Sequence, residues 1–372
     1  TPKSLTVSIN DKVLPTSSFS MVSNQAQVVW QKTNTQHNII DKQLRNVQLT
    51  VISAQKDLYP SLIKLNEQGG QHVVLVNKKH KVMFKRFKQH LSRPQTKIEI
   101  KNPASMLLIL TNSTELSTLN VKAEFIQEQQ TFNNVVGVLP GQTKTQESII
   151  YSAHYDHLGS VISDENNLND TIYNGADDNA SGVTGVIQLA EYFKQQNNNQ
   201  RSLLFVAFTA EEIGGFGSKY FSKQLAPENI KAMVNIEMIG KPSMFGEGKV
   251  WMTGFERSNL ARLMNKSLAK AHVKKFNHSE IYQDPYPAQK LFYRSDNATL
   301  ARLGVPAHSF SSTQLDKDRH YHQVTDEVDT LNLRSMQSVI ETIALASSGL
   351  VSGKQTPTRV DTSQVKGQGK IF

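Results

Sequence analysis

The chain has 372 residues, 38% of them hydrophobic, which is enough to bury the core of a large domain and of a smaller one. It contains no cysteine, which excludes disulfides, thiolate metal ligands and cysteine nucleophiles, and no apolar run is long enough to suggest a membrane span. The formal net charge of +9 comes from residues 1–130, which hold 17 Lys and Arg against 8 Asp and Glu, whereas the other 242 residues hold 24 of each.

The densest basic segment is KKHKVMFKRFKQH, residues 78–90, in which apolar side chains stand between Lys and Arg. A basic amphipathic helix of this kind can bind phosphates or an anionic surface. No recognisable nucleic-acid-binding module accompanies the segment. We therefore interpret it as the solvated face of a helix and expect no nucleic-acid partner.

Residues 1–125 alternate short apolar runs with helical patterns. Strands are predicted at residues 46–54 (NVQLTVISA), 72–76 (HVVLV) and 105–111 (SMLLILT), and helices at residues 59–70 and 82–91. The order of strand, helix and strand indicates a small α/β or α+β domain.

The elements become longer and more regular from about residue 126. Strands are predicted at residues 133–141 (NNVVGVLPG, closed by a Pro-Gly turn), Ser148–Ala153, Leu203–Phe208 and Ala232–Ile236, and helices after Asp178, from about Ser218 and at Leu333–Leu350. This alternation indicates an α/β fold with a mixed, mostly parallel central sheet and helices on both faces. Residues 352–372 are polar, and we expect them to pack loosely as a C-terminal tail.

Two adjacent acids begin the helix in NGADDNASGVTGVIQLAEYF, residues 174–193. Acidic side chains cap helices and complement the helix dipole, so Asp177 and Asp178 have an ordinary structural explanation. The helix itself is supported by an apolar face formed by Val183, Val186, Ile187 and Ala190. Whether the two acids do more than cap the helix depends on the side chains that the fold brings beside them.

Polar side chains follow three of the predicted strands at the point where each strand ends. His154 and Asp156 follow the first of these strands, Glu211 and Glu212 follow the second, and Glu237 ends the third. Ligands bind open α/β sheets at the carboxyl ends of the strands, and the loop after the first strand leads to Asp178. We therefore expect all these side chains to gather at one edge of the sheet.

Zinc chemistry explains why such residues would gather. Zinc binds imidazole nitrogen and carboxylate oxygen, and two zinc ions about 3.5–4 Å apart need a ligand that reaches both, for which Asp178 has two oxygens. A histidine ligand usually donates its other N–H to a carboxylate, and Asp156 stands two residues after His154. Of the neighbours Glu211 and Glu212, one can bind metal while the other accepts a proton from water.

A second histidine ligand is also required. The stretch DRHYHQVTDEVD, residues 318–329, offers His320 and His322, followed by three acidic residues. The residue pattern alone leaves the choice between the two histidines open.

Five segments carry a resemblance to a known family. SAHYDHLG, GADDNASGV, AFTAEEIGGFGS, VNIEMIG and HYHQVTDEVD occur in this order and resemble the five metal-site motifs of the two-zinc aminopeptidase family, which also contains glutamate carboxypeptidase, glutaminyl cyclases and the transferrin receptor ectodomain. The resemblance covers about residues 130–350. It implies a zinc metallopeptidase domain over residues 126–351, two Zn²⁺ ions per chain, peptide substrates, and hydrolysis that removes N-terminal residues from peptides.

The resemblance also implies a role for each motif residue. Asp178 would bridge the zinc ions, with His154 and Glu237 completing one site and Glu212 and His322 the other. Outside the metal ligands, the implied roles are a general base at Glu211, an orienting partner of His154 at Asp156, a donor to the developing oxyanion at Tyr321, and a loop-shaping residue at Asp177.

The sequence departs from the family pattern in three places. Glu237 stands where the family often has aspartate; both residues offer a carboxylate ligand, but the side chain of glutamate is longer by one methylene group. Asn297 stands where the family often has histidine, in a loop expected to border the substrate pocket. The chain also begins inside or just before the segment that corresponds to an inserted lid, so residues 1–125 are predicted to be a lid-like, protease-associated-like region.

The protein is expected to work outside the cytoplasm. The absent initiator Met, the lid-like region and the common location of bacterial family members lead us to expect a secreted or periplasmic protein whose leader has been removed or is not included.

The activity has three alternatives to an aminopeptidase. They are a one-zinc glutaminyl cyclase of the same fold, a carboxypeptidase that uses Arg294 or Arg319 for a substrate carboxylate, and a non-catalytic module. The intact DDNASG loop favours two metals over one, and the retained Glu211 argues against a non-catalytic module.

Overall fold

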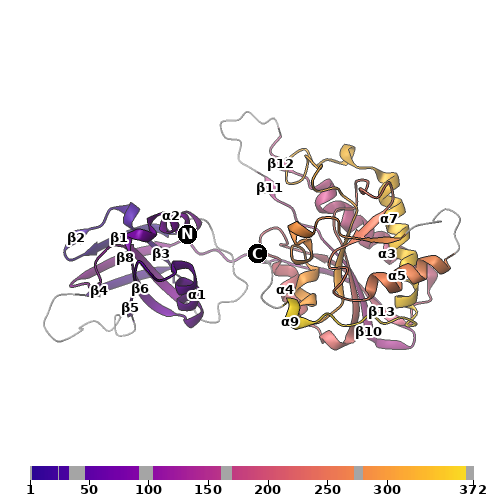
Figure 1. The fold of residues 1–372 in the computed structure, drawn as a ribbon, viewed down its shortest axis with the longest axis horizontal. Helices are drawn as coiled ribbons and strands as arrows, with labels where there is room; N and C mark the ends of the chain where they lie inside the picture. The colour runs from indigo at the N-terminus through magenta and orange to yellow at the C-terminus, as the bar shows by residue number, and fades with distance from the viewer. Residues whose placement is uncertain are drawn as a thin grey trace. The chain divides into compact units, whose positions relative to one another are not determined.

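The computed structural model describes residues 2–23, 25–32, 47–91, 104–160, 170–271 and 280–365 (Figure 1). The chain divides into two compact units, Thr1–Gln130 and Thr131–Phe372. This division lies five residues after the boundary predicted from the sequence at residues 125 and 126. Within the described residues, none of the helices combines the length and apolar character that crossing a bilayer requires.

The first unit contains two four-stranded sheets. One is antiparallel, in the order β2 (Lys12–Val13), β1 (Pro2–Ile9), β8 (Leu119–Phe125) and β4 (Gln27–Lys32). The other is mixed, in the order β3 (Phe19–Val22), β7 (Ala104–Leu110), β6 (Gly70–Val76) and β5 (Val47–Ile52), with only β3 antiparallel to its neighbour. The expected strand–helix–strand order over residues 46–111 is confirmed, whereas strands β1 to β4 and β8 were outside the prediction.

Strand β6 explains how this unit is layered. Val73 and Leu75 point into the core between the two sheets, whereas Val74 and Val76 point into a second core beneath the helices α1 (Leu58–Gln68) and α2 (Lys81–Leu91). A strand buried on both faces reads as a continuous apolar run, which is the pattern of HVVLV. Helix α2 buries Phe84 and leaves its Lys81, Lys85 and Arg86 side chains exposed, as a solvated basic helix face requires.

The second unit is built on a seven-stranded sheet. The strand order is β16 (Ile281–Gln283), β15 (Val250–Met252), β17 (Ala307–Ser311), β14 (Ile230–Ile236), β10 (Lys144–His154), β13 (Arg201–Phe208) and β9 (Val135–Leu139). Four of the six neighbouring pairs are parallel, and the β9–β13 and β15–β17 pairs are antiparallel. The predicted mixed, mostly parallel sheet is therefore confirmed. A separate two-stranded ribbon pairs β11 (Gly159–Ser160) with β12 (Ile172–Tyr173).

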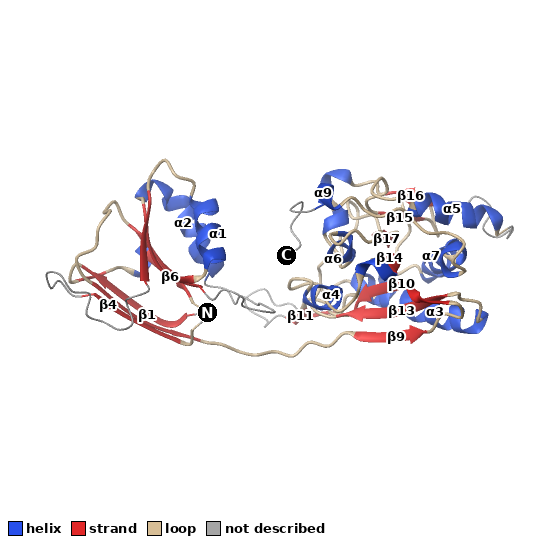
Figure 2. Cartoon of the chain, turned by 90° about the horizontal axis from the view of Figure 1, so that it is seen from below, coloured by secondary structure: helices blue, strands red, loops and turns tan. Residues whose placement is uncertain are grey.

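Helices cover both faces of this sheet (Figure 2). One face packs against α3 (Gly182–Gln196), α5 (Leu260–Lys270), α7 (Leu333–Ala346) and α8 (Ser348–Val351), and the other against α4 (Phe216–Ser222), α6 (Asn297–Ala301) and α9 (Thr362–Val365). Single 3-10 turns lie at Thr16–Ser18, Lys78–His80, Pro227–Asn229, Pro287–Gln289, Leu291–Tyr293 and Val328–Thr330. The segment Ala176–Ser181, which leads into α3, is kinked, and Asp178 and Asn179 within it have non-helical φ and ψ angles.

The buried face of α3 differs from the predicted one. The helix buries Val186, Leu189 and Phe193, but Ile187 is 59% exposed. Gly185 explains the rotation, because a Cβ atom there would lie 3.3 Å from the Cδ1 atom of Ile236. The helix therefore approaches strand β14 along its glycine side and turns Ile187 to solvent.

The C-terminal residues also differ from expectation. The predicted helix 333–350 is two helices, α7 and α8, separated at Ser347. The expectation of a loosely packed tail is wrong for residues 352–365, because Val360 and Val365 are buried in the core beneath α4 and α6. Residues 366–372 of the predicted tail lie outside the described residues.

Candidate metal centre

Strand register brings the predicted ligands together. Strands β10, β13 and β14 are parallel neighbours, with His154 opposite Phe208 and Ser152 opposite Asn235. Two residues beyond Ser152 and Asn235, His154 and Glu237 therefore reach the same edge of the sheet.

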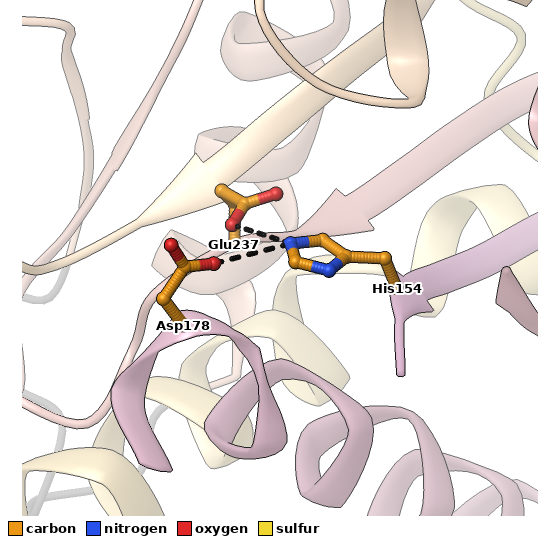
Figure 3. A group of neighbouring side chains, drawn as sticks. All are labelled: His154, Asp178 and Glu237. Carbon is orange, nitrogen blue, oxygen red and sulfur yellow. Dashed lines mark hydrogen bonds and ion pairs between the residues drawn. The ribbon is translucent and has the colours of Figure 1, made fainter. Parts of the chain in front are cut away.

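The first cluster consists of His154, Asp178 and Glu237. The Nε2 atom of His154 lies 3.2 Å from Oδ1 of Asp178 and 3.3 Å from Oε1 of Glu237 (Figure 3). The Ser295 hydroxyl donates a hydrogen bond of 2.6 Å to the other carboxylate oxygen of Glu237. The backbone carbonyl of Asp156 accepts from His154 Nδ1 at 3.0 Å, which directs Nε2 toward the carboxylates.

The second cluster shares Asp178 with the first. The Nε2 atom of His322 lies 3.2 Å from Oδ2 of Asp178 and 3.4 Å from Oε1 of Glu212. A further imidazole, that of His157, places Nδ1 2.9 Å from the same oxygen of Glu212, and donor atoms of His157, Asp178 and Glu212 all lie within 4.8 Å of one another. The two oxygens of Asp178 thus face two different histidines.

These donor sets fit zinc in chemistry and spacing. Imidazole nitrogen and carboxylate oxygen are the zinc ligands available to a chain without cysteine. A tetrahedron around zinc with bonds of about 2.0 Å has edges of about 3.3 Å. The four separations between His154 or His322 and their carboxylates are 3.2–3.4 Å, so each set matches the edges of such a tetrahedron.

The backbone is held in an unusual conformation at three positions around the clusters. Ala210, Met238 and His322 are non-glycine residues with φ of +57°, +50° and +56°. Ala210 directly precedes Glu211, and Met238 directly follows Glu237. Left-handed conformations of this kind cost energy and concentrate at functional sites, where surrounding structure enforces them. The peptide bond after Asp178 is cis.

Two carboxylates next to the clusters, those of Asp326 and Asp177, accept hydrogen bonds from the backbone of the loops that carry the ligands. Asp326 accepts hydrogen bonds from the backbone N–H groups of Asp177 and Asp178 at 3.0–3.2 Å. Asp177, which is fully buried, accepts from the backbone N–H of Gly240 at 2.7 Å and from the Thr313 hydroxyl at 2.6 Å. The sequence-based interpretation of Asp177 as a loop-shaping residue agrees with these contacts.

Asp156 has a similar supporting position. Its carboxylate accepts from the backbone N–H groups of Glu211 and Glu212 at 3.0 and 3.2 Å, and one of its oxygens lies 3.8 Å from Nδ1 of His154. Asp156 therefore contacts His154 through its backbone carbonyl and uses its side chain to fix the Glu211–Glu212 turn.

The clustered charges shift the pKa values of the site residues. Burial opposes protonation of His154, but Glu237 and Asp178 outweigh it and hold its pKa well above the usual value. Hydrogen bonds to Asp178 and Glu212 raise the pKa of His322 to about 9. Burial would raise the pKa of Asp178, but the two histidines lower it instead. Burial, reinforced by neighbouring carboxylates, raises the pKa of Glu211 well above its usual value.

A cavity opens over the two clusters. Its lining includes all five predicted metal ligands together with Glu211, Tyr321 and Arg294, and apolar side chains that include Met238, Trp251 and Leu291. The Tyr321 ring stacks on the His322 ring with centroids 4.0 Å apart, and its hydroxyl accepts from Nη2 of Arg294 at 3.3 Å. Arg319 is not among the lining residues.

Some residues of the site escaped the sequence interpretation. His157 stands inside the motif SAHYDHLG, three residues after His154, but its proximity to Glu212 depends on the path of the loop. Asn297 has no contact with the ligands among the hydrogen bonds of the described residues; its side chain binds Ser309 and the backbone carbonyls of Phe292 and Ala307. Asn297 therefore supports Ser309, which lines the cavity.

Comparison with known proteins identifies the family. The family model described as "Peptidase family M28" matches residues 134–347, more than half of the chain, and this range contains every residue of the two clusters. The chain belongs to peptidase family M28. The family prediction from the five motifs is therefore confirmed.

Individual relatives share less than a third of their aligned residues with this chain. Aminopeptidase YwaD of Bacillus subtilis (strain 168) is 29% identical over 128 residues, which are 33% of this chain and 25% of that protein. The uncharacterized protein YfbL of Escherichia coli (strain K12) is 26% identical over 217 residues, 52% of this chain and 64% of that protein. The matches span less than two thirds of the length of these curated relatives.

A solved structure shows the same fold. The structure described as BSAP, a zinc aminopeptidase from Bacillus subtilis, aligns over 96% of this chain and 84% of its own chain, with a TM-score of 0.51 and 14% sequence identity. At that identity the similarity establishes the fold of this M28 chain and leaves its substrates to be argued from the site.

Proposed function

We propose that this chain is a two-zinc peptidase that removes N-terminal residues from peptides. The observation that carries the proposal is the position of Asp178, whose two carboxylate oxygens each lie 3.2 Å from Nε2 of a different histidine. One metal would be held by His154, Glu237 and Asp178, and the other by Glu212, His322 and Asp178. When bound, zinc polarises a peptide carbonyl and lowers the pKa of water.

Glu211 is the proposed general base. It is 94% shielded from solvent, lines the cavity over the two clusters, and has its backbone N–H fixed by Asp156. Because burial raises the pKa of Glu211, its carboxylate is a stronger base than an exposed glutamate, and it can accept the proton of the attacking water and return a proton to the departing amine. The adjacent Glu212 faces a histidine and is assigned to metal binding.

Tyr321 is proposed to donate a hydrogen bond to the developing oxyanion. Burial, followed by the charge of Asp178, raises its pKa, so its hydroxyl keeps the proton that it would donate. Its hydroxyl also lies within reach of Arg294, which would orient it at the mouth of the cavity. A donor placed where charge develops stabilises the transition state more than the substrate.

The name of a relative supports the removal of N-terminal residues, because the Bacillus subtilis protein that is 29% identical over 128 residues is named an aminopeptidase. The cavity itself is lined by four carboxylates, Asp178, Glu211, Glu212 and Glu237, and Arg294 is the one Lys or Arg among the lining residues that the structure describes. Two Zn²⁺ ions would offset the four negative charges, so the charge of the loaded site would be close to balanced.

A substrate panel tests the proposal. We expect zinc-loaded protein to hydrolyse aminoacyl amides and free-amine peptides, to lose this activity in a chelator, and to be inactive on the N-acetylated versions. Cleavage of N-blocked peptides with a free carboxylate would identify a carboxypeptidase instead. Ammonia release from N-terminal glutamine without peptide cleavage would identify a glutaminyl cyclase.

Two broader roles are proposed on the resemblance alone. The first unit would act as a lid-like region for the peptidase unit, and the protein would work outside the cytoplasm. Hydrolysis rates of short and long peptides by the full chain and by residues 131–372 test the first, and fractionation of the source cells tests the second.

A further inference from the structure

We propose that His157 is a positioning residue for the second metal site, where its imidazole donates a hydrogen bond that holds the Glu212 carboxylate against His322 and Asp178. The inference rests on the two-metal function proposed above and adds a residue that the family resemblance did not assign.

The contact between His157 and Glu212 has the geometry of a hydrogen bond. Nδ1 of His157 lies 2.9 Å from Oε1 of Glu212, and each side chain is only 7% exposed. Two ligands of one tetrahedral zinc are about 3.3 Å apart, whereas an N–H donor and a carboxylate oxygen are 2.7–2.9 Å apart. The separation therefore identifies His157 as a donor to Glu212, although its nitrogen lies close enough to the cluster to be considered as a ligand.

The surroundings of the ring select the tautomer that can donate. Nε2 of His157 is buried and has no hydrogen-bond partner among the residues that the structure describes. A buried N–H without an acceptor is costlier than a bare ring nitrogen, which places the single proton of the neutral ring on Nδ1. That nitrogen is the one that faces Glu212.

Gly175 leaves room for the ring at this position. A Cβ atom on Gly175 would lie 2.6 Å from Cγ of His157, and Gly175 has φ of +63°. The ring of His322 stands edge-on to the His157 ring, with centroids 5.7 Å apart. The imidazole thus lies between a glycine that permits close approach and the histidine that completes the second cluster.

Glu212 needs such a donor because of its neighbours. Its carboxylate shares the cavity with those of Asp178, Glu211 and Glu237, which repel it. Its other partner, His322, comes from a loop and has a side chain that is 35% exposed. His157 also comes from a loop, but its side chain is only 7% exposed, so it gives Glu212 a buried partner. Hydrogen bonds to a ligating carboxylate orient it toward the metal.

The test measures zinc affinity at the two sites separately. His157→Ala removes the donor, His157→Asn restores an N–H near the Nδ1 position, and His320→Ala removes a histidine that contacts Thr325 and neither cluster. Each protein is titrated with zinc against a competing chelator, and the second equivalent of cobalt is followed by its visible absorption. Thermal unfolding in excess chelator compares the stability of the variants without metal.

We expect His157→Ala to keep the first zinc and to bind the second about 10–100-fold more weakly. His157→Asn should recover most of that loss, and His320→Ala should match the wild type. The proposal is overturned if His157→Ala binds both zinc ions like the wild type, or if His157→Asn loses the second zinc as fully as His157→Ala, which would make His157 a ligand. A wild-type stoichiometry of one zinc would instead overturn the two-metal function itself.

Discussion

The ammonium group of Lys241 lies 2.9 Å from both carboxylate oxygens of Asp318 and within 3.7 Å of the carboxylates of Asp177 and Asp326. The three acidic side chains are at most 3% exposed, and that of Lys241 is 13% exposed. Lys241 follows the loop of Glu237, Asp177 precedes Asp178, and Asp318 and Asp326 flank His322. One cation therefore joins three of the five segments that carry proposed ligands, those of Asp178, Glu237 and His322.

Removal of this cation should be strongly destabilising. Lys241→Met leaves three buried carboxylates without a counter-charge, and breaking a buried ion pair by removing one partner costs about 3–5 kcal/mol. Urea unfolding measures the free energy of unfolding of the variant and the wild type. Lys266→Met, at an exposed position of α5, is the matched control and should change stability by about 0.5 kcal/mol or less. Equal stability of the two variants would show that Lys241 is not needed to neutralise the cluster.

Asp178→Asn should disturb both metal sites. A neutral amide offers one weak oxygen where a bridging ligand needs two anionic ones. Metal analysis after mild dialysis should give two zinc ions for the wild type and fewer than one for the variant. Asp170→Asn, an exposed acid near β12, should retain the wild-type content. A variant that still binds two zinc ions would contradict the bridge.

The neighbours Glu211 and Glu212 should respond differently to the same substitution. Glu211→Gln keeps the size of the side chain and removes its basicity, so kcat should fall by about 10²–10⁴-fold while both metals stay bound. Glu212→Gln should lose activity together with one metal. Steady-state kinetics and metal content on the same samples separate the two roles. Near wild-type turnover by Glu211→Gln would remove Glu211 from the mechanism.

His308 should make stability depend on pH. It is fully buried on β17, where Nδ1 donates to the carbonyl of Thr253 and Nε2 accepts from the Ser258 hydroxyl, and burial lowers its pKa to about 4. The unfolded chain binds a proton near pH 6.5. Between about pH 6.5 and 4 the unfolded state holds more protons than the folded state, so stability falls as the pH falls, by up to about 1.4 kcal/mol per pH unit.

Urea unfolding in excess chelator at several pH values measures this effect as a difference between proteins. His308→Gln removes the titrating group, so the variant should lose less stability than the wild type between pH 6.5 and 4.5. Other titrating groups contribute equally to both proteins. Parallel curves for the two proteins would show that His308 does not resist protonation.

The sequence predicted those parts of the site that lie directly at strand ends. His154 and Glu237 are placed by the register of β10 and β14, and strand ends can be read from apolar runs. The ion pair between Lys241 and Asp326, which helps to hold the ligand-bearing loops, could not be predicted. It joins residues 85 positions apart, and both lie in loops whose sequences have no regular pattern. His157 was missed for a related reason, since a motif gives its position in the chain but not the direction of its ring.

The differences between the predicted and the observed fold can be traced to particular residues. The sequence predicted the helix α3 but not which of its faces is buried. Gly182 and Gly185 face β14, because residues without a side chain let the helix approach the strand closely, and this orientation leaves Ile187 exposed. Strand β1 buries only Val7 fully, so its sequence lacks the pattern of a strand with a buried face. Strand β8 was missed although LNVKAEF alternates apolar and polar residues, as a strand with one buried face does. The burial of Val360 and Val365 depends on contacts with distant helices that the polar composition of residues 352–365 conceals.

Arg201 links the sheet of the peptidase unit to the residues at and after α8. Its guanidinium group, 1% exposed, pairs with Glu147 and donates to the carbonyls of Leu350 and Gln355 and to the hydroxyl of Thr356. All three of these acceptors lie beyond residue 347, the last residue of the family match, and Gln355 and Thr356 also lie beyond α8. A chain shortened to the matched residues would lose three acceptors of this buried charged group, and it would also lose Val360 and Val365, which pack beneath α4 and α6. We therefore expect the folded peptidase unit to require the segment that follows the family match.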